Sequence, residues 1–328
     1  MESRHLLKAR GNPTLLSIII PAYNEQAILP VLRNRLTEFL QTLPCPVEVI
    51  FINDGSSDRT LDLLMEWAQA DARIKVLGLA RNFGHQAAVT AGLDAAAGDA
   101  IVIIDADLQD PPEIILQMIE KYREGYDVVY GQRLRRHGET LAKRFTAWLF
   151  YRLMRTFIYS DLPPDAGDFR LVSRQCLDAL RSMRETHRFI RGMVAWVGFA
   201  QTAVAYQRSP RAAGESKYPF RKMLRFAWTA TVSFSPLPLR LGLILGFAVA
   251  MLGFAFGIFV VLGRLFDWYR PAPGWASLVV LISLIGGAVL ISNGILGEYV
   301  GRIFEEAKHR PLYIVSSRAN LAPPAEEA

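Results

Sequence analysis

Residues 98–113 read GDAIVIIDADLQDPPE, and this stretch decides how the rest of the chain is arranged. Ile101 to Ile104 are consecutive apolar residues, a pattern typical of a strand buried on both faces. Asp105, Asp107 and Asp110 follow at once, with Gln109 among them. Clustered carboxylates repel one another, and a hard cation such as Mg²⁺ or Mn²⁺ offsets that repulsion. The stretch therefore favours a metal and phosphate site at Asp105 and Asp107. For Asp110 alone, a solvated turn that caps the next helix is the simpler interpretation.

The N-terminal half of the chain alternates short apolar runs with helical patterns. We expect strands over Leu15–Ile20, Val47–Ile52, Ile74–Leu79, Ile101–Ile104 and Asp127–Gly131. We expect helices over about Gln26–Leu40, about Asp58–Ala70, an Ala-rich stretch stopped near Gly98, and Pro112 to about Glu124. Strands that alternate with helices predict a mainly parallel, doubly wound α/β sheet.

Three of the predicted strands end in acidic or amide side chains. These are Asn24 and Glu25, Asn53 and Asp54, and Asp105 and Asp107. Ligands of open α/β sheets bind at the carboxyl ends of the strands, so this convergence predicts a nucleotide site. The chain has no GxxxxGK[ST] stretch and no GxGxxG after its first strand, which disfavours a P-loop kinase or a dinucleotide dehydrogenase.

The composition points to an anionic partner and a reducing compartment. The 328 residues carry a formal net charge of +6, which suits nucleic acid, phospholipid or a phosphorylated substrate. Only Cys45 and Cys176 occur, so we expect no disulfide framework. The N-terminal residues are too polar for a signal peptide.

Two basic segments follow the predicted sheet. Residues 132–145 hold five Lys or Arg against one Glu and run into an aromatic-rich stretch, which fits either an anionic membrane surface or a helix packed on its own domain. Phe169–Val172 predicts another strand, residues 187–199 a helix, and Gln201–Gln207 an edge strand. Residues 208–226 hold six Lys or Arg around a central Gly-Glu-Ser, which suits a diphosphate clamp or simply a solvated face.

The C-terminal third contains two long uncharged runs, Leu241–Gly263 and Pro271–Gly297. The first would be ~34 Å long as a helix, enough to cross a hydrocarbon layer of ~30 Å. We expect two membrane-spanning helices joined by a short external loop. Both ends of this helix pair then lie on the same side of the membrane, and the basic residues Arg221, Lys222, Arg225 and Arg240 before the first run make that side the cytoplasm. The tail after Arg310 is expected to be loose.

Six motifs in order carry a family resemblance. They are PAYNE (21–25), NDGSSD (53–58), RNFGHQ (81–86), DADLQDPPE (105–113), GDFRL (167–171) and GESKY (214–218). With them the chain resembles the inverting GT-A glycosyltransferases that attach one sugar to a polyprenyl phosphate, such as dolichol-phosphate mannosyltransferase and the bacterial undecaprenyl-phosphate glucosyl- and aminoarabinosyltransferases. The likeness extends through the predicted two-helix anchor. No Gln-x-x-Arg-Trp stretch of processive polysaccharide synthases is present, which argues for transfer of a single sugar.

The resemblance implies roles for individual residues. It assigns donor nucleotide binding to Pro21, Tyr23, Glu25, Asp54, Asp105, Ala106 and Asp107, and a divalent metal, Mg²⁺ or Mn²⁺, to Asp107 and Gln109. It implies that Arg133, Arg211 and Lys217 contact donor or acceptor phosphates. It also implies that Asp168 is the catalytic carboxylate and that Asp105 takes part in catalysis. Asn53 departs from the pattern, because many relatives carry Asp there.

We therefore expect a GT-A catalytic domain with a two-helix transmembrane anchor. The expected boundaries are an arm over 1–14, the GT-A domain over 15–207, a basic loop and interfacial helix over 208–238, the two transmembrane helices over 239–299 and a cytoplasmic tail over 300–328. The expected activity is metal-dependent, inverting transfer of one sugar from a UDP- or GDP-linked donor to undecaprenyl or dolichyl phosphate at the cytoplasmic face of the cell membrane. The resemblance also hints at a homotetramer. The sugar is not specified by the sequence.

Three alternatives have different chemistry. A transferase acting on a lipid hydroxyl would need a general base. A catalytically silent, nucleotide-sugar-binding membrane scaffold is opposed by the intact Asp105, Asp107 and Gln109. A nucleic-acid binder is suggested only by charge, and the basic residues cluster beside the apolar runs instead, so no nucleic-acid partner is expected.

Overall fold

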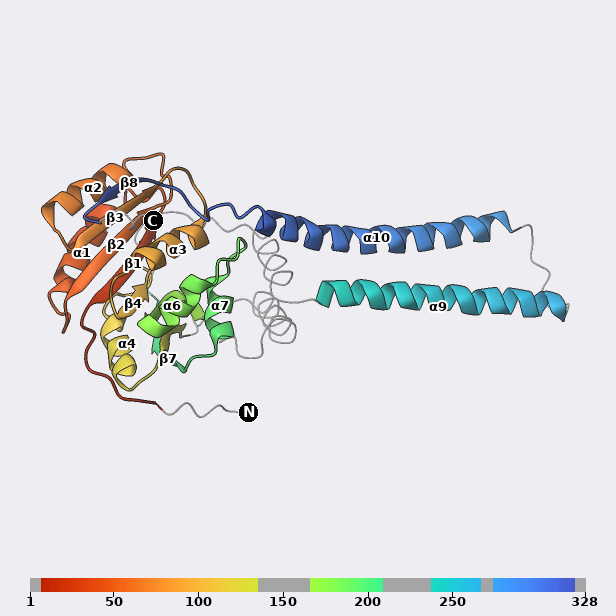
Figure 1. Cartoon of the computed structure of the whole chain (residues 1–328), viewed down its shortest axis with the longest axis horizontal. Helices are drawn as coiled ribbons and strands as arrows, with labels where there is room; N and C mark the ends of the chain where they lie inside the picture. Colours follow the sequence, from red (N-terminus) through yellow and green to blue (C-terminus); the bar gives the residue numbers. More distant parts are fainter. Residues whose placement is uncertain (1–6, 135–165, 209–236, 267–273, 322–328) are drawn as a thin grey trace. The chain divides into compact units, whose positions relative to one another are not determined.

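The computed structural model describes residues 7–134, 166–208, 237–266 and 274–321 (Figure 1). The basic segments beyond residue 134 and around GESKY, including Arg211 and Lys217, lie outside the described residues. The chain divides into two compact units. One contains the sheet with its helices and the residues after 310, and the other contains the two long C-terminal helices.

Within the described residues, the first unit is built on one eight-stranded sheet in the order β7-β5-β6-β4-β1-β2-β3-β8. The strands are β1 Leu16–Ala22, β2 Val47–Asn53, β3 Ile74–Leu79, β4 Ala100–Ile103, β5 Val128–Arg133, β6 Ala166–Ser173, β7 Gln201–Tyr206 and β8 Val315–Ala319. β1 is parallel to β2 and β4, β2 to β3, and β5 to β7. The expected parallel α/β core is confirmed, and β7 lies at an edge as predicted. β6 and β8 pair antiparallel with their neighbours, so the sheet is mixed.

Helices cover both faces of this sheet. They are α1 Leu29–Leu40, α2 Thr60–Ala70, α3 His85–Ala95, α4 Ile114–Arg123, α6 Arg174–Ser182 and α7 Ile190–Val197. The short helix α6 was not predicted from the sequence. It begins at Ser173, whose hydroxyl accepts a hydrogen bond from the Cys176 amide as an N-cap.

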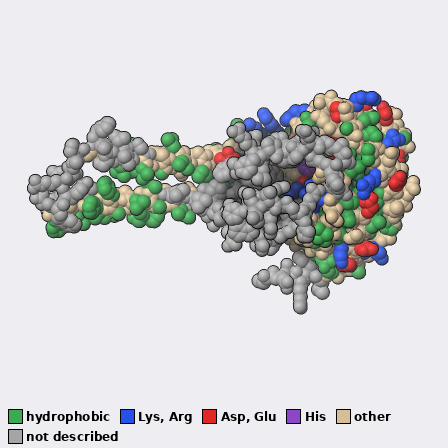
Figure 2. All heavy atoms as spheres, turned by 180° about the vertical axis from the view of Figure 1, so that it is seen from behind, with side chains coloured by type: hydrophobic (Ala, Val, Ile, Leu, Met, Phe, Trp, Pro, Cys, Tyr) green, Lys and Arg blue, Asp and Glu red, His purple; other side chains and the backbone are tan. Residues whose placement is uncertain are grey.

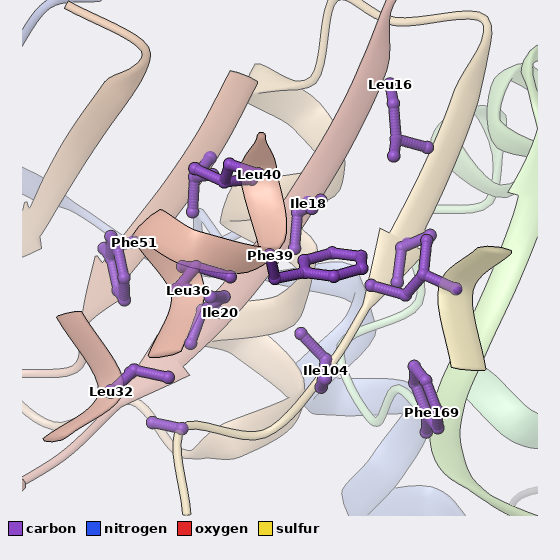
Figure 3. Close-up of a cluster of buried hydrophobic side chains, with 14 of the residues drawn as sticks. Leu16, Ile18, Ile20, Leu32, Leu36, Phe39, Leu40, Phe51, Ile104 and Phe169 are labelled. Carbon is purple, nitrogen blue, oxygen red and sulfur yellow. The ribbon is translucent and has the colours of Figure 1, made fainter. Parts of the chain in front are cut away.

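The core of the first unit follows the alternation of β1. Leu16, Ile18 and Ile20 belong to one buried cluster together with α1, and Figure 3 shows their side chains beside Leu36 and Phe39 of that helix. Side chains of the intervening positions face the opposite layer, where α3 packs so closely that a Cβ at Gly92 would lie 2.3 Å from Ile19. Because β1 is buried on both faces, its sequence is almost wholly apolar.

The parallel strands bring their carboxyl ends to one edge of the sheet. β1, β2 and β4 are neighbours and run in the same direction, so the residues after Ala22, Asn53 and Ile103 leave the sheet at the same edge. This is the arrangement that the three polar strand ends predicted, and it positions the candidate site.

The residues after Arg310 do not form a loose tail, so that expectation is wrong for residues 311–321. β8 pairs antiparallel with β3 and covers its open edge. The Asn320 side-chain amide donates to the carbonyls of Ala68, at 2.7 Å, and Ile74, at 2.8 Å. The Tyr313 hydroxyl donates to Asp94 of α3 at 2.9 Å. The short, polar sequence of β8 carries no strand signal of its own, and it is ordered because β3 offers it an unpaired edge.

The second unit contains α9 Leu237–Leu265 and α10 Trp275–Ala307, which lie alongside each other. Gly242 of α9 faces Ser292 and Ile295 of α10 at 3.8 and 3.6 Å from an added Cβ. Hydrophobic side chains cover the surfaces of both helices (Figure 2), including Phe247, Phe254 and Leu290, each more than 60% exposed.

The two uncharged runs therefore form long helices, but the two-helix membrane anchor is only partly supported. Among the described residues, one stretch, Leu284–Ala307, is long and apolar enough to cross a membrane by length and composition. The apolar stretch Gly246–Phe259 of α9 is shorter. α10 also continues past the predicted end at Gly297 to Ala307.

Candidate active site

The first part of the site is the turn after β2. The carboxylate of Asp54 is buried and accepts hydrogen bonds from the amides of Phe83, at 2.8 Å, and Gly84, at 3.0 Å. Gly55 has a φ of +63°, and a Cβ there would lie 2.3 Å from the carbonyl carbon of Arg81. Burial raises the pKa of Asp54, although the two amides oppose that shift. The Asp54 carboxylate thus binds the turn after β2 to the backbone of the 81–84 loop.

Asn53, the residue that departs from the family pattern, is also buried. Its Oδ1 has no hydrogen-bond partner within the part of the chain that the structure describes. A carboxylate at this position would place an uncompensated charge beside that of Asp54, which is far more costly than an amide. The local burial therefore gives a physical reason for Asn at position 53.

The second part of the site joins α3, β6 and α7 through one ion-paired cluster. The His85 Nε2 atom lies 3.3 Å from Asp168 Oδ2 and 4.0 Å from Asp105 Oδ1. Arg191 of α7 donates to both oxygens of Asp168, from Nε at 2.6 Å and from Nη2 at 2.9 Å. The side chains of Asp105 and His85 are 33% and 38% exposed, so both remain accessible to a ligand.

The two carboxyls of this cluster are shifted in opposite directions. Burial favours the neutral form of Asp168, but Arg191 and His85 hold its pKa well below the usual range. Burial raises the pKa of Asp105, the charge of His85 opposes that shift, and repulsion from Asp168, Asp107 and Asp110 adds to it. Burial works against a charged imidazole, yet the hydrogen bond to Asp168 and the charges of Asp105 and Asp168 raise the pKa of His85. Asp168 is therefore a firmly ionised, ion-paired carboxylate.

Asp110 is not a solvated turn residue, and that interpretation is wrong. Its side chain is only 1% exposed and lies 3.4 Å from Arg133 Nη2 and 3.3 Å from Arg208 Nε. The Tyr206 hydroxyl donates to the same carboxylate, and Arg133 Nε donates to that hydroxyl oxygen at 3.3 Å. Burial and the bond to Asp110 raise the pKa of Tyr206. The reason is the topology of the sheet. Arg133 ends β5, Tyr206 ends β7 and Arg208 follows β7, and the sheet brings these residues near the end of β4.

The residues expected to hold a metal follow β4 directly. Ala106 is buried, and Leu108 has a φ of 56°. The Asp107 carboxylate accepts a hydrogen bond from the backbone N–H of Gln109 at 3.1 Å. Among the described residues, no three His, Cys, Asp or Glu side chains form a metal-binding group. The carboxylate of Asp107 and the amide oxygen of Gln109 nevertheless fit Mg²⁺ or Mn²⁺, because such ions commonly take their other ligands from water and substrate phosphates.

The PAYNE segment, residues 21–25, is the remaining part of the candidate site. Pro21 pairs within the sheet opposite Ile52, and Tyr23 is 43% exposed. The Glu25 amide donates to the Thr60 hydroxyl at 2.9 Å, which ties the segment to the start of α2. An exposed aromatic ring at a strand end can stack against a base, as the resemblance implies for Tyr23.

Comparisons with known proteins agree with this geometry. The description "Glycosyl transferase family 2" matches residues 17–181. The Bacillus subtilis protein "Uncharacterized glycosyltransferase YkcC" is 48% identical over 299 residues, covering 91% of this chain and 92% of that protein. The chain belongs to glycosyl transferase family 2. The "Bactoprenol glucosyl transferase" of Shigella phage SfV is 39% identical over 302 residues, covering 92% of this chain and 98% of that protein.

A solved structure is similar to a lesser degree. The mannosyltransferase PcManGT from Pyrobaculum calidifontis, in complex with GDP-Man and Mn²⁺, is 15% identical with a TM-score of 0.43. The match covers 88% of this chain and 90% of that one.

As a family 2 glycosyltransferase, the chain places most of its predicted site residues around one sheet edge. Asp54, Asp105 and Asp168 are linked through the loop that carries His85, and Arg133 lies beside Asp110. The positions of Arg211 and Lys217 lie outside the described residues and stay a prediction.

Four residues near these positions were missed by the sequence analysis. They are His85, Arg191, Tyr206 and Arg208. His85 had a signal, because it is part of the RNFGHQ motif. Arg208 also had a signal, because it opens the basic segment 208–226 that the sequence offered as a diphosphate clamp. Arg191 and Tyr206 lie in segments predicted only as a helix and an edge strand, and nothing in their local sequence marks them as facing the site.

Proposed function

We propose that this family 2 enzyme transfers a single sugar from a UDP- or GDP-linked donor to a polyprenyl phosphate, with inversion at the anomeric carbon. The observation that carries the proposal is the 39% identity, over 98% of its length, to a protein named bactoprenol glucosyl transferase. Glucose is accordingly the first sugar to test. The acceptor is undecaprenyl or dolichyl phosphate.

The state of Asp168 supports a phosphate acceptor. A lipid phosphate is already ionised near neutral pH, so its oxygen attacks the sugar without losing a proton to the protein. The bond from the anomeric carbon to the nucleoside diphosphate breaks as the bond to the acceptor oxygen forms on the opposite face. Asp168, held by Arg191 and His85 with a lowered pKa, is a poor proton acceptor and suits orientation or charge stabilisation.

Departure of the nucleoside diphosphate is the step that needs positive charge. Asp107 and Gln109 would hold the divalent ion, which would neutralise the diphosphate. Arg133 and Arg208 share the single carboxylate of Asp110, so these three side chains together carry one net positive charge. Arg211 and Lys217 would add charge from the basic loop.

The principal alternative is a lipid hydroxyl acceptor such as diacylglycerol. That reaction needs a general base, and Asp168 is a weak one because Arg191 and His85 hold its pKa well below the usual range. A silent scaffold is the less favoured alternative, because the chain retains Asp105, Asp107 and Gln109.

We further propose that the chain is anchored by α9 and α10 in the cell membrane, with the catalytic domain, the basic loop and residues 300–328 in the cytoplasm. The exposed apolar surfaces of both helices support this anchor. The same proposal keeps the arm over 1–14, the catalytic domain over 15–207, the basic loop over 208–238 and the helices over 239–299. A homotetramer stays a prediction that sizing of the detergent-solubilised protein tests.

The deciding experiment incubates the purified, detergent-solubilised chain with undecaprenyl phosphate and a panel of UDP- and GDP-sugars, with and without Mn²⁺. The expected product is one glycosyl-phosphate lipid with inverted configuration. Lys217→Ala should slow its formation on the order of 10- to 150-fold, the effect of losing one charge-assisted phosphate contact. Product on diacylglycerol and none on undecaprenyl phosphate would overturn the proposal.

A further inference from the structure

His85 links the carboxylates of Asp105 and Asp168. Its Nε2 atom contacts Asp168 Oδ2 at 3.3 Å and approaches Asp105 Oδ1 to 4.0 Å. Asp105 follows β4 and Asp168 lies in β6, so the imidazole joins two neighbouring strands at the edge where the site lies. The carboxylates of Asp105 and Asp168 repel each other, and the imidazole N–H that lies near both reduces that repulsion.

The backbone fixes where this imidazole sits. His85 is the first residue of α3, and it follows Gly84, whose φ is +97°. The backbone amides of Phe83 and Gly84 both donate to the buried Asp54 carboxylate. The last two residues before His85 are therefore held by the residue that follows β2. The close approach of Gly55 to the backbone of Arg81 and Asn82 leaves this loop little room to shift.

Arg191 completes the arrangement from the other side. Its two hydrogen bonds to Asp168 approach from α7, whereas His85 approaches from α3. With a donor from each helix, the carboxylate plane of Asp168 is defined in both position and rotation.

We propose that His85 is a positioning residue, held in place by Asp54, that fixes Asp168 relative to Asp105 for sugar transfer. The catalytic effect of His85 rests on the proposed function, whereas the contacts that hold its imidazole do not depend on that function. It also gives Asp54 a second task besides contact with the nucleotide, because Asp54 sets the loop from which His85 projects.

The charges around His85 favour its protonated form. Asp105, which follows β4, and Asp168 of β6 attract its charge, and Arg191 of α7 repels it. Asp54, at the end of β2, also interacts with it electrostatically. The net effect raises the pKa of His85. Its contribution to stability is therefore full below the ordinary histidine pKa and is lost as the pH rises through the elevated value.

The kinetic test compares His85→Ala, His85→Gln and a matched control, His309→Asn, at an exposed histidine outside the site. His85→Ala should lower kcat on the order of 10- to 100-fold with the donor KM within about threefold of wild type, because geometry and not donor affinity is lost. His85→Gln keeps an N–H donor and should recover part of the loss, and His309→Asn should match wild type. An unchanged kcat in His85→Ala, or no recovery in His85→Gln, overturns the proposal.

A second readout does not depend on activity. Nitrogen-15 NMR of the five histidine imidazoles, assigned by single substitutions, follows the titration of His85 in the full chain. The His85 pKa should lie above the ordinary histidine value and should fall in Asp168→Asn. The His85 resonance should also shift or broaden in Asp54→Asn. A His85 imidazole that titrates at the ordinary histidine value and responds to neither substitution refutes the positioning role. If wild type transfers no sugar to a polyprenyl phosphate, the proposed function fails while this measurement still judges the position of His85.

Discussion

Asp168→Asn is the substitution that best separates a phosphate acceptor from a hydroxyl acceptor. In the wild type, Oδ1 accepts from Arg191 Nε at 2.6 Å, and Oδ2 accepts from Arg191 Nη2 at 2.9 Å with His85 Nε2 at 3.3 Å. Asparagine keeps one oxygen but turns an amide NH₂ toward a cationic donor. The substitution therefore removes one charge-assisted contact and leaves the fold of β6 in place.

The expected size of the effect follows from the loss of this one charge-assisted contact. Losing one hydrogen bond to a charged group costs ~1.5–3 kcal/mol, or about 10- to 150-fold in rate if the contact is needed in the transition state. Loss of a general base would remove a contribution that is typically ~10²- to 10⁴-fold and with it a limb of the pH profile. Because the pKa of Asp168 lies well below its usual range, the residue stays ionised throughout the assay range, and the variant should keep the wild-type profile shape.

The sign of the stability effect can be checked on the same sample. A depressed carboxyl pKa stabilises the folded state above the unfolded pKa, and this stabilisation is lost as the pH falls through the folded value. Asp168→Asn should therefore lower the unfolding temperature at pH 7 and differ less from wild type in acid. The assay is extraction of the glycolipid formed from undecaprenyl phosphate between about pH 5 and 9, with exposed Asp178→Asn of α6 as the matched control. A loss near the upper end of the ~10²- to 10⁴-fold range of a general base, with residual activity that lacks the wild-type acidic limb, would refute this reasoning and favour a hydroxyl acceptor.

Three further predictions concern metal, topology and the C-terminal strand. Asp107→Ala should abolish transfer without unfolding the domain, and EDTA should stop the wild type until Mg²⁺ or Mn²⁺ is restored; full activity in a chelated sample would contradict the assignment. A cysteine probe at position 267 should react with an impermeant reagent from outside the cell and one at exposed Arg318 should not, whereas the reverse pattern would invert the proposed orientation. Asn320→Ala removes two hydrogen bonds to backbone carbonyls, each worth ~0.5–1.5 kcal/mol, and should lower the unfolding temperature by about 2–10 °C, while an unchanged temperature would show that β8 is not held by this residue.

Most strands and helices of the catalytic unit could be read from the sequence, because burial on both sheet faces leaves long apolar runs. β1 to β5 and α1 to α4 start and end within a few residues of the prediction. The elements that were missed, α6 and β8, are short and have mixed composition. β8 is a strand because β3 has an unpaired edge, a long-range condition that no local pattern records.

The sequence by itself determined the type of fold and the main carboxylates of the candidate site, since parallel strands place their carboxyl ends at one edge and the polar residues there stand out against apolar runs. Only the tertiary structure decided what those carboxylates contact. Asp110 and Asp168 look alike in the sequence, yet one is paired with Arg133, Arg208 and Tyr206, and the other with His85 and Arg191. These partners come from strands and helices far along the chain, and the ionisation state of each carboxyl depends on which charges the fold brings within a few ångströms.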